Sequence, residues 1–258
     1  MLAGFAALAF AGARLAFKDR VGAPDVALEV ERGLRPVMRR QIAREGTVVD
    51  APVVTDAFAA ILDRLTAGLG DLPAAPEVLV VDSPVVNAAA LPGGIVVVYT
   101  GLVRTLETPE QMAAVLAHEL VHVERRDAVA QLAREIGMAA ITSAISGGGD
   151  NAAQALLRSA IDLHYSRAAE DRADAQGLDL LERSGIDPGA FGDALGRIVE
   201  AGRATPRLLR WLDEHSDVDS RIARAKSRSL SAAGPHRPLD VDWRRVRLAL
   251  PTVFDAGG

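Results

Sequence analysis

The fold is decided by the segment Ala117-His118-Glu119-Leu120-Val121-His122-Val123, whose apolar surroundings predict a helix. Two His residues four positions apart lie on one helix face, so both imidazoles can reach a single metal ion. Zinc is the default metal for this pattern, and Glu119 points toward the open coordination position as a general base. The spacing therefore predicts a hydrolytic metal centre. The alternative is an amphipathic helix whose polar residues pack against neighbours.

The third metal ligand must come from another part of the chain. The residues that follow His122 lack the Gly and third His of the metzincins, which excludes that class. Farther on, Glu170 and Asp174 lie one helical turn apart and can address the same site. We expect Glu170 to be the third ligand and Asp174 to accept the outer N–H of a metal-bound His, fixing its tautomer. The alternative is a solvated helix, because Glu, Asp and Arg alternate from 167 to 174.

The order of these motifs resembles the zinc metallopeptidase family that includes HtpX-like and CAAX prenyl endopeptidases, of the gluzincin type. The shared pattern is His118-Glu119-x-x-His122 followed by Tyr165-Ser166-Arg167-x-x-Glu170-x-x-x-Asp174. Residues 87–102 are similar to the strand-and-turn segment that precedes the family's active helix. Residues 215–222 resemble its late His-Pro…Arg-Ile segment, with Ser216 where the family usually has Pro. The similarity covers roughly residues 75 to 225.

The resemblance implies a mainly helical α+β fold, zincin-like, with a small β-sheet ahead of the active-site helix. It implies one Zn²⁺ per chain, held by His118, His122 and Glu170. Zinc in such a site activates water for hydrolysis. Glu119 is then expected to take the proton from the attacking water and to deliver it to the leaving amine.

Three further residues receive roles from the same resemblance. Asn87 lies on the substrate-side edge of the sheet, with an ordinary turn or strand-end Asn as the alternative. His215 is expected to stabilise the oxyanion as a hydrogen-bond donor, with a helix-capping surface His as the alternative. Arg221 is expected to orient His215 or the Glu ligand.

These residues together predict a zinc-dependent endopeptidase that acts on unfolded or extended protein segments, in protein quality control. A strand edge beside the metal can pair with the main chain of an extended substrate, and this mode of binding is β-augmentation. The alternative is a zinc-bound chaperone or adaptor for envelope proteins that is latent or non-catalytic.

Composition limits the remaining possibilities. The chain has 258 residues, 49% of them hydrophobic and 24% charged, which is enough for one domain with a sizeable core. A net charge of −5 gives no case for nucleic-acid binding. The sequence contains no Cys, so disulfides and thiolate metal sites are excluded while the redox compartment stays open.

The first 17 residues are apolar apart from Arg14. A helix of this length is roughly 25 Å long, slightly short for an unaided membrane span. Ala11-Gly12-Ala13 fits a signal-peptide cleavage site, so the choices are a signal peptide, a short anchor or an amphipathic helix that packs on the body. We expect export or anchoring in the cell envelope, either periplasmic or associated with the inner membrane. A cytoplasmic location is the alternative.

We expect the peptidase domain to cover residues 18–228 and a linker with a C-terminal extension to cover 229–258. Ahead of the metal motif, the pattern predicts helices interrupted around Gly33 and Pro36 and another helix starting near Asp50. Short strands are then expected over 78–81, from 85 onward and over 95–99, with a turn at 92–94.

The helix that bears the metal motif should begin at Thr108-Pro109, because Thr is a good N-cap and Pro suits the first helical position. Its apolar pattern continues to the glycines at 147–149. The next helix is expected to run from Asp150 or Asn151 to near Gly185 and to carry Glu170. The last twenty residues are expected to add a strand-like segment.

Overall fold

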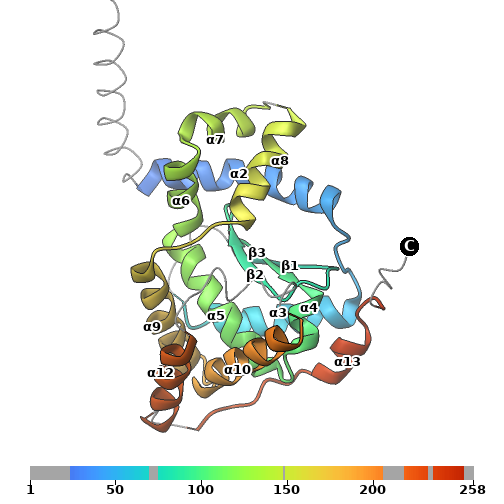
Figure 1. Ribbon diagram of the computed structural model, residues 1–258, viewed down its shortest axis with the longest axis vertical. Coiled ribbons are helices and arrows are strands. Elements are labelled where there is room, and N and C mark those ends of the chain that lie inside the picture. Colours follow the sequence, from blue (N-terminus) through green and yellow to red (C-terminus); the bar gives the residue numbers. More distant parts are fainter. Residues whose placement is uncertain (1–23, 70–74, 148, 206–217, 232–234, 253–258) are drawn as a thin grey trace, which may run out of the picture.

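The sheet at the centre of the molecule has three strands (Figure 1). The computed structural model describes residues 24–69, 75–147, 149–205, 218–231 and 235–252. The strands are β1 (Glu77–Val81), β2 (Ala88–Leu91) and β3 (Ile95–Tyr99), in the order β1-β3-β2. β1 runs parallel to β3 and β2 runs antiparallel to it, so β1 and β2 are the two edges. Helices surround this sheet, and the predicted α+β, mainly helical class is confirmed.

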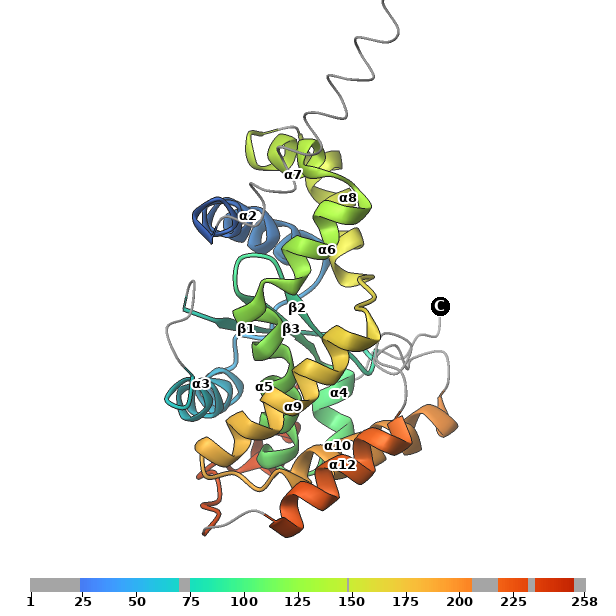
Figure 2. The same ribbon diagram turned by 90° about the vertical axis from the view of Figure 1, so that its left-hand side faces the viewer.

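Helices cover both faces of the sheet. One group lies on the side of α2, and the other lies on the side of α5, as Figures 1 and 2 both show. The first group consists of α2 (Pro24–Glu45), α6 (Asp127–Glu135), α7 (Met138–Ile145) and α8 (Asp150–Ile161). The second group contains α3 (Pro52–Thr66), α4 (Thr100–Thr105), α5 (Pro109–Arg125), α9 (Arg167–Arg183), α10 (Gly189–Ala204), α12 (Val218–Ser231) and α13 (Trp243–Leu248).

The period of two along a strand divides the core into two clusters. Ile95 and Val97 of β3 pack with the α2 group, whereas Val96 and Val98 pack with α3, α5 and α10. All four side chains are buried, which explains why β3 is a continuous apolar run rather than an alternating one. The sheet is therefore the layer that joins the two helical groups.

The turn between β2 and β3 lies where the sequence predicts it. Gly93 and Gly94 have φ of 90° and 73°, a region that side chains with Cβ rarely adopt. A Cβ on Gly93 would also lie 2.6 Å from the Cα of Arg35 in α2. Glycine is required here by both the backbone conformation and the close approach of the helix.

α2 differs from its prediction, because it continues through both Gly33 and Pro36. Four buried side chains on one face hold α2 against the sheet: Leu34, Val37, Met38 and Ile42. Their packing outweighs the cost of roughly 3 kcal/mol for a Pro inside a helix. Gly33 permits contact with α7, since its Cβ would lie 2.9 Å from Cγ2 of Ile145.

Two predicted long helices are each divided in the structure. The metal-motif helix ends at Arg125. Arg126, a non-glycine residue with φ of 57°, separates it from α6, and Gly137 separates α6 from α7. The helix predicted from Asp150 to Gly185 is interrupted by the non-helical residues 162–166. The breaks at Arg126 and at residues 162–166 therefore occur where no Gly or Pro marks them in the sequence.

The C-terminal prediction of a strand-like segment is wrong, because residues 243–248 form the helix α13. Trp243 is buried, and its indole N–H donates to the carbonyl of Leu106 at 3.0 Å. α12 continues past residue 228, the end of the predicted peptidase domain. Within the described residues, no helix combines the length and apolar character needed to cross a bilayer, and the N-terminal segment 1–17 lies outside them.

Candidate active site

α5 positions the metal motif in the middle of the molecule. It starts as predicted, with the Thr108 side chain accepting from the Gln111 N–H at 3.2 Å and Pro109 at the first position. Its side chains from Gln111 to Val123 are buried, because the helix packs against the sheet, α9 and α10. His118, Glu119 and His122 are at most 1% exposed, so their rotamers are held by packing.

α9 supplies the carboxylates predicted for the same site. Ser166 caps this helix by accepting from the Ala169 N–H at 3.3 Å. Gly177 lies at the crossing with α5, where an added Cβ would be 3.3 Å from the backbone nitrogen of His118. This close crossing brings Glu170 and Asp174 of α9 to the two His residues of α5.

The three predicted ligands meet at one point. Nε2 of His118 and Nε2 of His122 are 3.3 Å apart. Oε2 of Glu170 lies 3.6 Å from Nε2 of His118, and Oε1 of Glu170 lies 3.4 Å from Nε2 of His122. Ligand atoms about 2.0–2.1 Å from a tetrahedral metal ion are separated from one another by about 3.4 Å. The donor set and its spacing therefore fit a metal ion held by these three side chains.

The outer nitrogen of each His faces a carboxylate. Nδ1 of His118 lies 3.0 Å from Asp174, as predicted, and Nδ1 of His122 lies 2.9 Å from Asp127. A carboxylate at Nδ1 stabilises the tautomer whose proton is on Nδ1, which leaves Nε2 free to bind metal.

The sequence analysis missed Asp127. In a continuous helix, a residue five positions after His122 would point to another face. The left-handed turn at Arg126 brings Asp127 back toward His122. An acidic residue shortly after the second His of the motif was the only available signal.

Asp174 connects the ligand shell to α12. Arg221 donates to both oxygens of Asp174, at 2.8 and 2.6 Å, and lies 3.8 Å from Glu170. Burial alone would raise the pKa of Asp174, but hydrogen bonds with His118 and Arg221 and their positive charges hold it below its usual value. Arg221 also lies over the ring of Phe191, 5.4 Å from the centroid, and that ring stacks on His118. Arg221 therefore contacts both carboxylates that α9 brings to the two His residues.

His122 is surrounded by acidic groups. Burial alone would lower its pKa, but hydrogen bonds with Asp127 and Glu170 and the charges of Glu119 and Glu170 raise the pKa to about 9. The environment is therefore strongly attractive to positive charge, whether a proton or a metal ion carries it.

Glu119 connects the metal ligands to the sheet edge. Its Oε2 accepts from the backbone N–H of Ala90 in β2 at 2.9 Å. Asn87, the predicted substrate residue, is buried just before β2, and its Oδ1 accepts from the Ala88 N–H at 2.9 Å. The structure thus places Glu119 and Asn87 beside the same strand.

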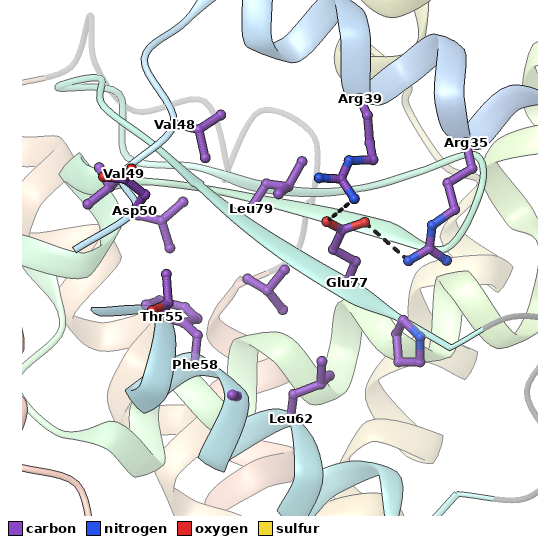
Figure 3. A pocket seen from close by; sticks show the side chains of 14 residues that line it. Arg35, Arg39, Val48, Val49, Asp50, Thr55, Phe58, Leu62, Glu77 and Leu79 are labelled. Carbon is purple, nitrogen blue, oxygen red and sulfur yellow. Dashed lines mark hydrogen bonds and ion pairs between the residues drawn. The ribbon is translucent and has the colours of Figure 1, made fainter. Parts of the chain in front are cut away.

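His215, the predicted oxyanion donor, is outside the described residues. A cavity of about 520 Å³ lies at the opposite edge of the sheet, beside β1 (Figure 3). There Glu77 pairs with Arg35 at 3.1 Å and Arg39 at 2.9 Å, above Phe58. None of the metal ligands lines that cavity.

A helix that carries H-E-x-x-H and a following helix that contributes a Glu define the gluzincin-type metallopeptidases, and the fold and site belong to this class. The chain is a member of peptidase family M48, whose family model matches residues 54–229. This match confirms the family predicted from the motifs.

Curated relatives agree with this assignment. The chain is 25% identical to the "Beta-barrel assembly-enhancing protease" of Escherichia coli (strain K12), over 74% of this chain and 42% of that protein. It is 30% identical to the "Mitochondrial metalloendopeptidase OMA1" of Schizosaccharomyces pombe, over 63% of this chain and 49% of that protein. The chain therefore spans less than half the length of these relatives.

Proposed function

We propose that this protein is a zinc-dependent endopeptidase that hydrolyses peptide bonds in unfolded or extended protein segments. The observation that carries the proposal is the convergence of His118, His122 and Glu170, with ligand atoms 3.3 to 3.6 Å apart and Glu119 beside them. Two imidazoles and one carboxylate form a donor set that catalytic zinc sites use.

Zinc, when bound, supplies Lewis-acid polarisation of the scissile carbonyl and activates water. Glu119 accepts the proton of the attacking water and transfers it to the leaving amine, because its carboxylate lies between the ligands and the edge strand. Asp174 and Asp127 orient the two His ligands, and Arg221 holds Asp174. His215 would donate to the developing oxyanion.

Extended substrates suit this site because β2 is an edge strand. Pairing with β2 would hold the main chain of the substrate beside Glu119, and a folded protein cannot offer such a segment. Asn87 would help to shape this edge. The similarity to a β-barrel assembly-enhancing protease and to a mitochondrial metalloendopeptidase supports a role in protein quality control.

Cleavage of β-casein, an unfolded protein, tests the proposal. We expect the zinc-loaded protein to cleave it, and a chelator to stop cleavage. Glu119→Gln should retain one zinc ion but lose at least about 100-fold in turnover, because a general base contributes about 10²- to 10⁴-fold. Cleavage by zinc-loaded Glu119→Gln at the parent rate would contradict the assigned mechanism.

The second candidate is a latent or non-catalytic zinc-bound adaptor. It is favoured by one observation: the cavity between β2, Glu119 and residues 160–165 measures only about 10 Å³. A cavity of roughly 10–15 Å³ is the smallest that can hold one water molecule, so this one leaves no room for a substrate. A single, tightly bound zinc ion without any cleavage of β-casein would support this candidate.

A further inference from the structure

We propose that Tyr165 latches the active-site cleft shut and that an extended substrate must displace it to reach β2. The proposal rests on the proposed peptidase site and specifies how that site is regulated. It follows from the hydrogen bonds that already occupy the outer edge of β2, where a substrate strand would pair.

The backbone groups on this outer edge belong to Ala88 and Ala90. The Tyr99 N–H donates to the Asn87 carbonyl at 3.1 Å, so the backbone carbonyl of Asn87 faces β3. Neighbouring residues in an edge strand alternate in direction, so the N–H and C=O groups of Ala88 and Ala90 point outward. These four groups are the ones that could bond to an added strand.

Three of the four groups are already bonded within the chain. The Ala88 N–H donates to Oδ1 of Asn87 and the Ala90 N–H donates to Oε2 of Glu119, both at 2.9 Å. The Ala90 carbonyl accepts from the hydroxyl of Tyr165 at 3.5 Å. A substrate strand cannot pair with β2 until these contacts are exchanged, and one of them occupies the general base itself.

The Tyr165 ring also lies over a metal ligand. It stacks on the ring of His122 with centroids 4.1 Å apart and an interplanar angle of 13°. Together with Ile161 and Leu163, it encloses the small cavity beside Glu119. Tyr165 therefore covers both the strand edge and the metal site.

The segment that carries Tyr165 is suited to move. Residues 162–166 connect α8 to α9 without helical structure, and Asp162 and His164 are exposed. Leu163 is the buried side chain that anchors this segment to the core. Because this segment has few buried contacts and no regular backbone hydrogen bonding, opening it locally costs less free energy than unfolding the whole protein.

A closed latch reduces apparent substrate affinity by the fraction of molecules that are open. Tyr165→Phe keeps the ring on His122 and removes only the hydroxyl that holds Ala90. One net hydrogen bond shifts such an equilibrium by about 2- to 10-fold. We expect Tyr165→Phe to lower KM for β-casein by this factor while kcat stays within about twofold.

Binding tests the latch separately from catalysis. In the Glu119→Gln background, fluorescein-labelled β-casein should bind the Tyr165→Phe protein about 2- to 10-fold more tightly, as measured by fluorescence anisotropy. Tyr99→Phe, which removes the only other tyrosine hydroxyl of the chain, is the matched control and should leave the Kd unchanged. Both arms use the whole 258-residue, zinc-loaded chain.

The outcomes separate the two proposals. An unchanged or weaker Kd for Tyr165→Phe overturns the latch even if the parent protein cleaves β-casein. Tighter binding without cleavage by any variant supports the latch and overturns the peptidase proposal. An equal gain from Tyr99→Phe would also overturn the latch, because the effect would not depend on the contact with Ala90.

Discussion

At the scale of single residues, the candidate metal site contains paired groups behind the proposed ligands as well as the ligands themselves. His118 and His122 have similar surroundings: each is buried, each directs Nε2 to Glu170, and each has a carboxylate at Nδ1. The two carboxylates differ in their support, because Asp174 is held by Arg221 while Asp127 is held by the turn at Arg126.

We predict that Asp127→Asn weakens metal binding by about 10- to 100-fold, the usual cost of losing a carboxylate behind a His ligand. The amide retains an acceptor oxygen but loses the negative charge that makes His122 a stronger donor to metal. Competition with a chromogenic chelator measures the effect. Asp63→Asn, an exposed position in α3, is the control and should bind metal like the parent. Equal affinity for Asp127→Asn and the parent would show that Asp127 has no orienting role.

At the scale of elements, the position of β2 depends on the junction between β3 and α4. The Gly101 N–H donates to the Ser83 carbonyl at 2.8 Å, which fastens the loop that leads into β2. A Cβ on Gly101 would lie 2.3 Å from the Pro84 carbonyl oxygen, too close for any real contact. The Thr-Gly-Leu segment therefore has a steric role in setting the edge of the cleft.

Gly101→Ala is expected to lower the free energy of unfolding by about 1–3 kcal/mol, because backbone must shift to relieve the overlap. Gly196→Ala is the matched control, since Gly196 is exposed in α10 and its Cβ would meet nothing within 4 Å. Gly196→Ala should raise the free energy of unfolding by about 0.4–1 kcal/mol, because Ala lowers the conformational entropy of the unfolded chain. Urea titration measures both changes, and stabilisation by Gly101→Ala would refute the steric argument.

Particular elements show how far sequence patterns reach. The start of α5 and the turn at 92–94 were predictable, because capping and turn chemistry is local. α2 was predicted with breaks, because local propensity does not record the packing of its buried face on the sheet. The division between α8 and α9 was missed because residues 162–166 contain neither Gly nor Pro.

At the scale of the whole molecule, stability depends on the contact between the α2 group and the sheet. Glu31 of α2 is buried there, and its carboxylate accepts from the Gly93 N–H of the β2–β3 turn. Burial raises the pKa of Glu31 from 4.5 to about 7, against the opposing effects of the Gly93 bond and the charge of Arg126. The folded protein thus holds this proton more tightly than the unfolded chain does.

This difference predicts a pH dependence of folding. Stability falls as pH rises from about 4.5 to about 7, by roughly 3 kcal/mol, and the loss is complete above that range. Glu31→Gln keeps an acceptor for Gly93 but cannot ionise. Both proteins are measured in the presence of a chelator. We expect the difference in free energy of unfolding, variant minus parent, to increase by up to this amount between pH 5 and pH 8. Parallel curves for the two proteins would contradict the prediction.

The sequence by itself determined the family, the three candidate metal ligands, Glu119 and Asp174, because helical spacing and the chemistry of donor atoms are properties of short segments. Only the tertiary structure decided that Asp127 supports His122 and that Tyr165 covers β2. Both contacts depend on non-helical backbone, at Arg126 and at residues 162–166, where the chain changes direction. Such changes arise from packing between distant elements, which no local pattern encodes.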